Sequence, residues 1–86
     1  MTTLRIPVND QFTITQEKVT YLINILSRFD SSVIIHDQNR MINAKSLLGI
    51  LSLGYPKSGF FEFVIEGPDE AAVRDALLDH FQRLQN

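Results

Sequence analysis

Apolar and polar residues alternate in two stretches of the chain, near the N-terminus and in the second half. In residues 3–8, Leu4, Ile6 and Val8 fall on one side, and in residues 60–66 the inward set is Phe61, Phe63 and Ile65. A period of two is typical of a half-buried β-strand. Pro7 cannot donate to a strand ladder, so its amide side is expected to face an edge or a bulge.

Apolar residues recur at three- and four-residue steps in residues 16–29 and again after Asp69, which predicts two amphipathic helices. Thr15 is expected to cap the first helix and Asp69 the last. Ser46 is expected to cap a short helix over residues 47–51. The apolar positions of the two long helices are Val19, Leu22, Ile23, Leu26, Phe29, Val73, Ala76, Leu77, Phe81 and Leu84.

Residues 33–37 and 40–43 are predicted to form two strands joined by a turn at Gln38 and Asn39, and residues 54–59 a loop. The predicted order is βαββαβα. We therefore expect one α+β domain over residues 1–86, an open-faced sandwich with a four-stranded antiparallel sheet and helices on one face. The other face of the sheet is expected to meet solvent.

The net charge and the lack of cysteine make several classes of function unfavourable for this chain. The 86 residues carry a net charge of −2 and no cysteine. The absence of a basic surplus disfavours nucleic-acid binding, and no apolar run reaches the roughly 20 residues of a membrane span. Without cysteine there are no disulfides or thiolate metal sites, which suits a cytoplasmic protein. Neither a cofactor nor a metal is indicated.

Residue chemistry offers little support for an enzyme. His36 and His80 are isolated from glycine turns and from arginine, so we interpret them as surface or edge histidines rather than metal ligands or nucleophiles. A small phosphate-handling hydrolase on a similar sandwich needs a phosphate-cradling loop with an arginine. The loop after the first strand, residues 9–12, is acidic and has no glycine. That alternative is therefore disfavoured.

One segment carries a family resemblance. Residues 43–54 have the sequence NAKSLLGILSLG. This stretch resembles the regulatory-serine segment of HPr, the histidine-containing phosphocarrier family of the bacterial sugar phosphotransferase system. Residues 27–31 look like the end of the family's first helix, and residues 66–71 look like the start of its last. The resemblance runs over nearly the whole chain and implies the HPr-like fold.

The second family signature differs here. In the family, a Gly-apolar-His-x-Arg-Pro pattern precedes and begins the first helix, and the corresponding residues here are 13–18. Only the apolar Ile14 matches. Thr15 stands at the position of the phosphoryl-accepting histidine, Glu17 at that of the arginine and Lys18 at that of the proline. The resemblance therefore implies a member without phosphohistidine chemistry and without catalytic residues.

The resemblance also implies a regulatory phosphorylation at Ser46 by the HPr serine kinase. The neighbouring Lys45 is expected to add positive charge beside that serine. It implies a docking patch as well, for that kinase, for a transcriptional regulator or for components of the phosphotransferase system. The partner-binding candidates are Gln16, Leu47, Leu48, Leu51 and Tyr55.

The leading hypothesis is thus a regulatory or binding module similar to the catabolite-repression HPr-like protein, which also lacks the histidine. Two alternatives stay open. One is a phosphocarrier that uses another residue, Thr15 or His36. The other is a docking domain that is not phosphorylated at all. The sequence leaves the oligomeric state undetermined.

Overall fold

The computed structural model describes residues 1–8, 15–54 and 59–84. Four strands and three helices follow one another in the predicted order. Their bounds are β1 (Thr2–Pro7), α1 (Gln16–Leu26), β2 (Ser32–Asp37), β3 (Arg40–Asn43), α2 (Leu47–Leu53), β4 (Phe60–Glu66) and α3 (Glu70–Leu84).

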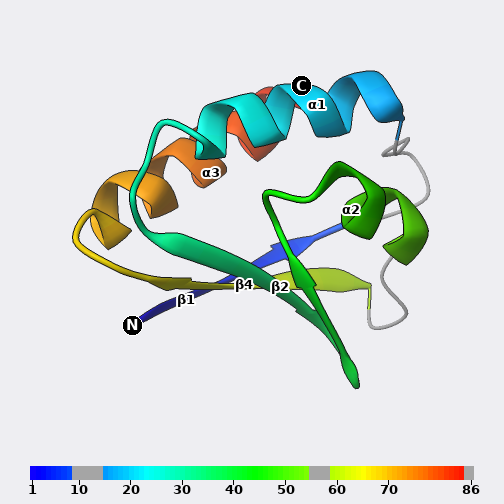
Figure 1. Cartoon of the computed structure of the whole chain (residues 1–86), viewed down its shortest axis with the longest axis horizontal. Helices are drawn as coiled ribbons and strands as arrows, with labels where there is room; N and C mark the ends of the chain where they lie inside the picture. The colour runs from blue at the N-terminus through cyan, green and yellow to red at the C-terminus, as the bar shows by residue number, and fades with distance from the viewer. Residues whose placement is uncertain (9–14, 55–58, 85–86) are drawn as a thin grey trace.

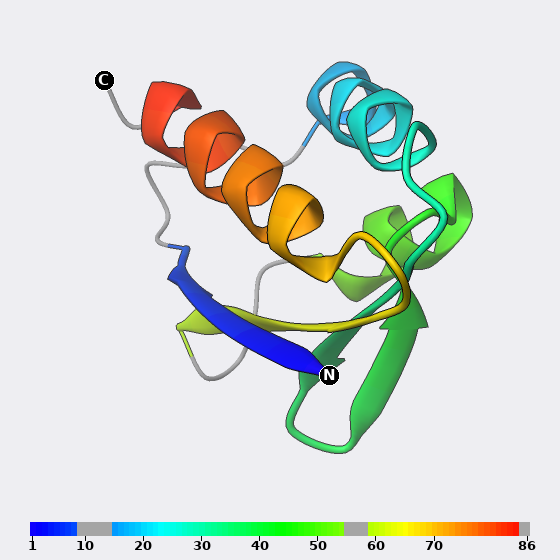
Figure 2. The ribbon, with the colours of Figure 1, turned by 90° about the vertical axis from the view of Figure 1, so that its left-hand side faces the viewer.

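The strands form one antiparallel sheet in the order β1-β4-β2-β3. Figures 1 and 2 show all three helices on the same side of this sheet. The predicted open-faced α+β sandwich is confirmed. β1 lies at one edge of the sheet, in agreement with the expectation from Pro7.

The core lies between the sheet and the helices, and β4 supplies its centre. Phe63 and Ile65 are fully buried, and Phe61 is 4% exposed. These are the inward positions of the predicted alternation. Leu26 of α1 and Leu77 of α3, both at 0% exposure, cover them from the helical layer. Burial of this apolar face holds α1 and α3 on the sheet, because short isolated helices are marginal in water.

α1 ends at Leu26, three residues before the predicted end at residue 29. The amide of Arg28 donates to the carbonyl of Ile25 (3.3 Å) and that of Phe29 to Leu26 (3.1 Å), so the chain tightens into three-residue hydrogen bonds. Phe29 still packs against the core. The apolar periodicity therefore continued past the point where the helix itself stopped.

A polar link joins the end of α1 to the start of α3. The carboxylate of Asp69 accepts hydrogen bonds from the amides of Asp30 and Ser31, both at 2.9 Å, and from the hydroxyl of Ser31. The Ser31 hydroxyl and the Asp30 amide hold the pKa of Asp69 below its usual value. The carbonyl of Asp69 accepts from Val73 (3.1 Å), as expected of a cap position. Its side chain, however, binds the α1–β2 connection instead of the first turn of α3.

Candidate functional site

The N-terminus of α1 holds the residues at which the sequence resemblance places the family's phosphoryl-acceptor signature. Thr15 caps the helix as predicted, with an extended backbone (φ −117°, ψ 158°). Its Oγ1 accepts a hydrogen bond from the amide of Lys18 at 3.2 Å. Thr13 and Ile14, which also belong to that signature, lie outside the described residues. The Thr15 hydroxyl therefore serves the helix end, where it satisfies one of the free amides of the first turn.

Gln16 and Glu17 follow Thr15, and both side chains are exposed. Glu17 lies in the first turn of α1, where the partial positive charge of a helix N-terminus favours a carboxylate. The surface beside Thr15 thus presents a negative charge to solvent. This is the opposite sign to the one that binds phosphate.

Ser46 caps α2, which confirms the predicted cap. Its backbone is extended (φ −105°, ψ 114°), and its Oγ accepts from the amide of Gly49 at 3.1 Å. Lys45 was expected to add positive charge beside it. Instead, the Lys45 ammonium donates to the carbonyls of Phe29 and Ser31, both at 3.0 Å. The ammonium group is therefore held by the α1–β2 connection.

The three leucines of the predicted patch differ in exposure. Leu48 is 80% exposed, whereas Leu47 and Leu51 are partly buried against the core. Ile50 and Leu53, at 3% and 4% exposure, anchor α2 from beneath. Tyr55 lies outside the described residues. The apolar surface of α2 is therefore centred on Leu48.

His80 departs most from its sequence interpretation. It was expected at the surface, but it is 5% exposed and lies between α3 and α1. Its ring stacks on Tyr21 (centroids 5.6 Å apart) and meets Phe81 edge-on (5.1 Å). Burial lowers the pKa of His80 below its usual 6.5, against the opposing charge of Asp79. A histidine at an apolar helical position can pack as an aromatic, and the signal for this in the sequence is its spacing from Val73 and Leu77.

His36 lies on β2 and is half-buried on the open face of the sheet. Its Cα partners are Glu62 of β4 on one side and Met41 of β3 on the other. It thus lies on an interior strand at the solvent-facing surface of the sheet, which is the first of the two placements expected for it. In the part of the chain that the structure describes, no three histidines, aspartates or glutamates come together as a metal site.

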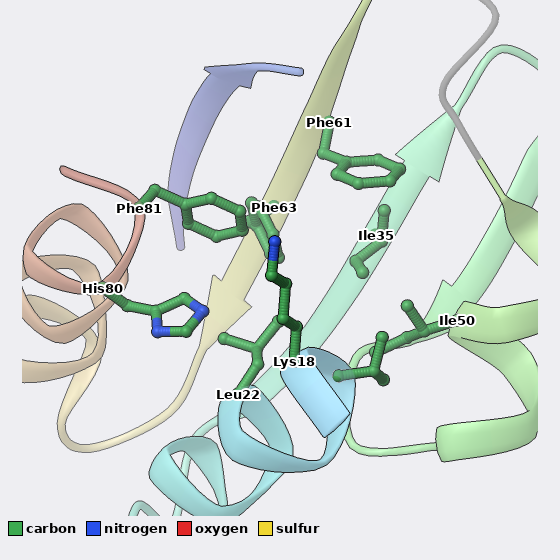
Figure 3. A pocket seen from close by; sticks show the side chains of 9 residues that line it. Lys18, Leu22, Ile35, Ile50, Phe61, Phe63, His80 and Phe81 are labelled. Atoms are coloured by element: carbon green, nitrogen blue, oxygen red, sulfur yellow. The ribbon is translucent and has the colours of Figure 1, made fainter. Parts of the chain in front are cut away.

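A small apolar cavity lies beside His80, between the helices and the sheet (Figure 3). Lys18 and Leu22 of α1, Phe63 of β4 and Phe81 of α3 are among the residues that line it. Its volume of about 20 Å³ leaves room for about one water molecule. The cavity is too small for a substrate or cofactor. None of the candidate residues Gln16, Ser46 and Leu48 on α1 and α2 lines it.

The pKa of His80 predicts an acid-sensitive stability. Because the folded pKa is depressed, the neutral form is favoured by folding, and stability is complete above the ordinary pKa of 6.5. It is lost progressively as the pH falls below that value. We expect urea unfolding between about pH 7.5 and pH 5 to show this loss, and His80→Phe to reduce it while keeping the ring contacts. His36→Gln, the matched control, should retain the full pH dependence. Equal slopes in all three proteins would contradict the assignment.

The fold defines the class of protein as a small α+β open-faced sandwich, in which Thr15 caps α1 and Ser46 caps α2. A family model described as the PTS HPr component phosphorylation site matches residues 3–83, and the chain belongs to the HPr family. In the part of the chain that the structure describes, no helix is long and apolar enough to cross a membrane.

Individual relatives agree with this assignment. The phosphocarrier protein HPr of Treponema pallidum is 34% identical over 61 residues, which are 71% of this chain and 69% of the relative. Among solved structures, HPr-C-His of Thermoanaerobacter tengcongensis superimposes with a TM-score of 0.85 at 26% identity, over 98% of this chain and 94% of its own. Crh, the Bacillus subtilis catabolite repression containing protein, has a TM-score of 0.72 at 22% identity, over 96% and 95% of the two chains.

Proposed function

We propose that this chain is a regulatory or docking member of the HPr family that does not carry phosphohistidine. HPr proteins are phosphocarriers of the phosphotransferase system rather than enzymes, and we assign this chain to the same cytoplasmic system. The observation that carries the proposal is the composition of the N-terminus of α1, where Thr15 and Glu17 occupy the positions of the family's histidine and arginine.

Thr15 is unsuited to phosphoryl relay for two reasons. An imidazole accepts a phosphoryl group near neutral pH without first losing a proton, whereas a threonine hydroxyl needs an activating base. The hydroxyl of Thr15 also accepts the hydrogen bond that caps α1. A threonine phosphate, once formed, is an ester too stable for rapid transfer. The residue is better suited to starting the helix than to carrying phosphate.

Glu17 opposes the same reaction electrostatically. The family's arginine offsets the charge that develops on the transferred phosphoryl group. A carboxylate at that position repels the group by roughly 1 kcal/mol or more at close range. The same charge would disfavour partners that present acidic residues to the arginine of other HPr proteins. Glu17 thus argues for a different choice of partner as well as for the loss of transfer.

Ser46 and the surface of α2 are the proposed regulatory part. Phosphorylation of Ser46 would place a charge of about −1.5 to −2 beside the exposed Leu48. An apolar patch changes its partners when such a charge is added. Leu48 would form the centre of the docking patch, and Gln16, Leu47 and Leu51 would form its periphery. The Bacillus subtilis relative Crh is named for catabolite repression, and we propose that regulatory class for this chain.

The proposal is tested by intact-mass measurement after two separate incubations. With phosphoenolpyruvate and Enzyme I, we expect no phosphoryl group on this chain, while an HPr with its histidine becomes fully labelled. With ATP and the HPr serine kinase, we expect one phosphoryl group, which Ser46→Ala abolishes. The matched control Ser52→Ala, on an exposed serine of the same helix, should remain labelled.

Each outcome assigns the chain to one hypothesis. Transfer from Enzyme I would refute the proposal, and mapping would show whether Thr15 or His36 carries the group. The absence of label in both incubations would remove the kinase from the proposal. It would favour the alternative of a docking domain without phosphorylation.

A further inference from the structure

A row of side chains that can bind a metal crosses the open face of the sheet, on the side away from the helices. His36 of β2 is the Cα partner of Met41 of β3 on one side and of Glu62 of β4 on the other. Residues directly opposite one another on antiparallel strands present their side chains on the same face. Because Ile35 and Asp37 are buried in the opposite face, His36 and both of its partners lie on the open one.

The hydrogen-bond pattern of the sheet brings His36 and Met41 especially close. The amide of Ala44 donates to the carbonyl of Val33 at 2.9 Å, so the odd-numbered residues of β2 exchange hydrogen bonds with β3. His36 and Met41 are therefore a pair without mutual hydrogen bonds, in which the Cα atoms are about 4.5 Å apart and the side chains are closest. An imidazole and a thioether at this spacing can contact the same ion.

A groove of about 260 Å³ opens beside this row, and His36, Gln38, Phe60 and Glu62 line it. Gln38 lies in the turn between β2 and β3 with a φ of 57°, a left-handed conformation that is uncommon for residues other than glycine. Such conformations cluster at functional sites. The turn thus places an amide in the same groove as the imidazole of His36, which gives an ion bound there a polar surrounding on its open side.

The side chains of the row are available to a ligand. Among the residues that the structure describes, none forms a hydrogen bond or an ion pair with the imidazole of His36. Met41 is 67% exposed, so its thioether is not needed to fill the core. Glu62 already forms an ion pair with the guanidinium of Arg5, at 3.0 Å. The arginine offsets the charge of the carboxylate, and the row therefore favours a singly charged cation over a divalent one.

We propose that His36 and Met41 bind a Cu(I) ion, with Glu62 as the neighbouring counter-charge. Thioethers select Cu(I) among the common biological metals, and imidazole is a copper ligand as well, whereas sites built from oxygen suit magnesium, calcium or manganese. The chain has no cysteine that would compete for the ion. The spacing of residues along the chain does not indicate this site, because His36 and Met41 meet only when the β2–β3 hairpin closes. The inference is independent of the proposed function.

The site is tested by titration of the native chain with Cu(I), kept in solution without oxygen as its acetonitrile complex and followed by NMR. The ring signals of His36 and the methyl signal of Met41 should shift together and saturate at one ion per chain. His80 and Met1 are the other histidine and methionine of the sequence, and their signals should not move. These two residues therefore serve as internal controls.

Two variants separate the contributions of the two ligands. His36→Gln removes the imidazole, and Met41→Leu removes the sulfur while keeping a side chain of similar size. Each should weaken the binding of Cu(I) at least tenfold, as is usual when a metal site is altered. The matched control is His80→Phe, which should keep the native affinity because His80 is 5% exposed and lies between α1 and α3.

Several results would overturn the proposal. One is the absence of saturable binding of Cu(I) to the native chain. Another is an affinity that Met41→Leu leaves unchanged, which would indicate an imidazole acting alone. An equal loss in the His80→Phe control would indicate that the variants act through the stability of the fold. Finally, an equal affinity for Zn²⁺ would show that the thioether does not select a soft ion.

Discussion

The triple variant Thr15→His, Glu17→Arg, Lys18→Pro is expected to accept a phosphoryl group from phosphorylated Enzyme I about 100-fold or more faster than the native chain. The histidine supplies a nucleophile that needs no deprotonation. The arginine replaces a repulsive charge with an attractive one. The proline protects the stability of the helix. The Lys18 amide loses its hydrogen-bond acceptor when Thr15 is replaced, and a proline at position 18 has no amide hydrogen that needs an acceptor.

Thr15→His alone is the informative control. It has the nucleophile but keeps the Glu17 carboxylate beside it, so its transfer should be about tenfold slower than that of the triple variant. The rate of phosphoryl transfer is read from intact mass against time. A triple variant that unfolds like the native chain yet gains no phosphoryl group would contradict our view of these three positions. It would indicate that the chain fails to dock to Enzyme I, whatever residues stand at these positions.

Gly67→Ala is expected to lower the free energy of unfolding by about 3 kcal/mol. Gly67 has a φ of +150°, which an L side chain rarely adopts. A Cβ atom there would lie 2.5 Å from the Cα of Ser31 and 2.6 Å from its Oγ. Ser31 is fully buried and hydrogen-bonded to Asp69, so neither the backbone nor the hydroxyl has room to move. The clash would separate the connections that precede β2 and α3.

Gly54→Ala separates the steric cost from the conformational one. Gly54 has a φ of +65°, but no atom lies within 4 Å of the position of its Cβ. Its ψ of −148° places it in a region that is nearly restricted to glycine, so the variant should cost only the conformational strain of about 1–2 kcal/mol. Urea unfolding of both variants measures the difference. Equal losses at the two glycines would show that the close approach of Ser31 to Gly67 is not tight in solution.

The order and faces of the elements were predictable because they depend on spacing along the chain. The alternation of Phe61, Phe63 and Ile65 predicted the buried side of β4, and all three are at the centre of the core. The caps at Thr15 and Ser46 were predictable because a cap requires one hydroxyl next to one helix start. The end of α1 was not predictable from spacing, because Phe29 continues the apolar pattern although the helix ends at Leu26.

For the candidate site, the sequence indicated which residues stand at the family's positions but not how each is used. It grouped Leu47, Leu48 and Leu51, and the structure separates the exposed Leu48 from its partly buried neighbours. It placed the Lys45 charge beside Ser46, and the ammonium is instead bound to two carbonyls of the α1–β2 connection. Tyr55 and the kinase site at Ser46 stay predictions.

The sequence by itself thus determined the family and the order of strands and helices, and it led to the proposal that Thr15 and Glu17 replace the family's histidine and arginine. Only the tertiary structure decided that His80 is buried against Tyr21, that Asp69 holds Ser31, and that β1 has an open edge. Periodicity and capping depend on neighbours a few residues apart. Burial, desolvation and edge exposure depend on segments that are distant in sequence, and they exist only once the sheet and helices have packed.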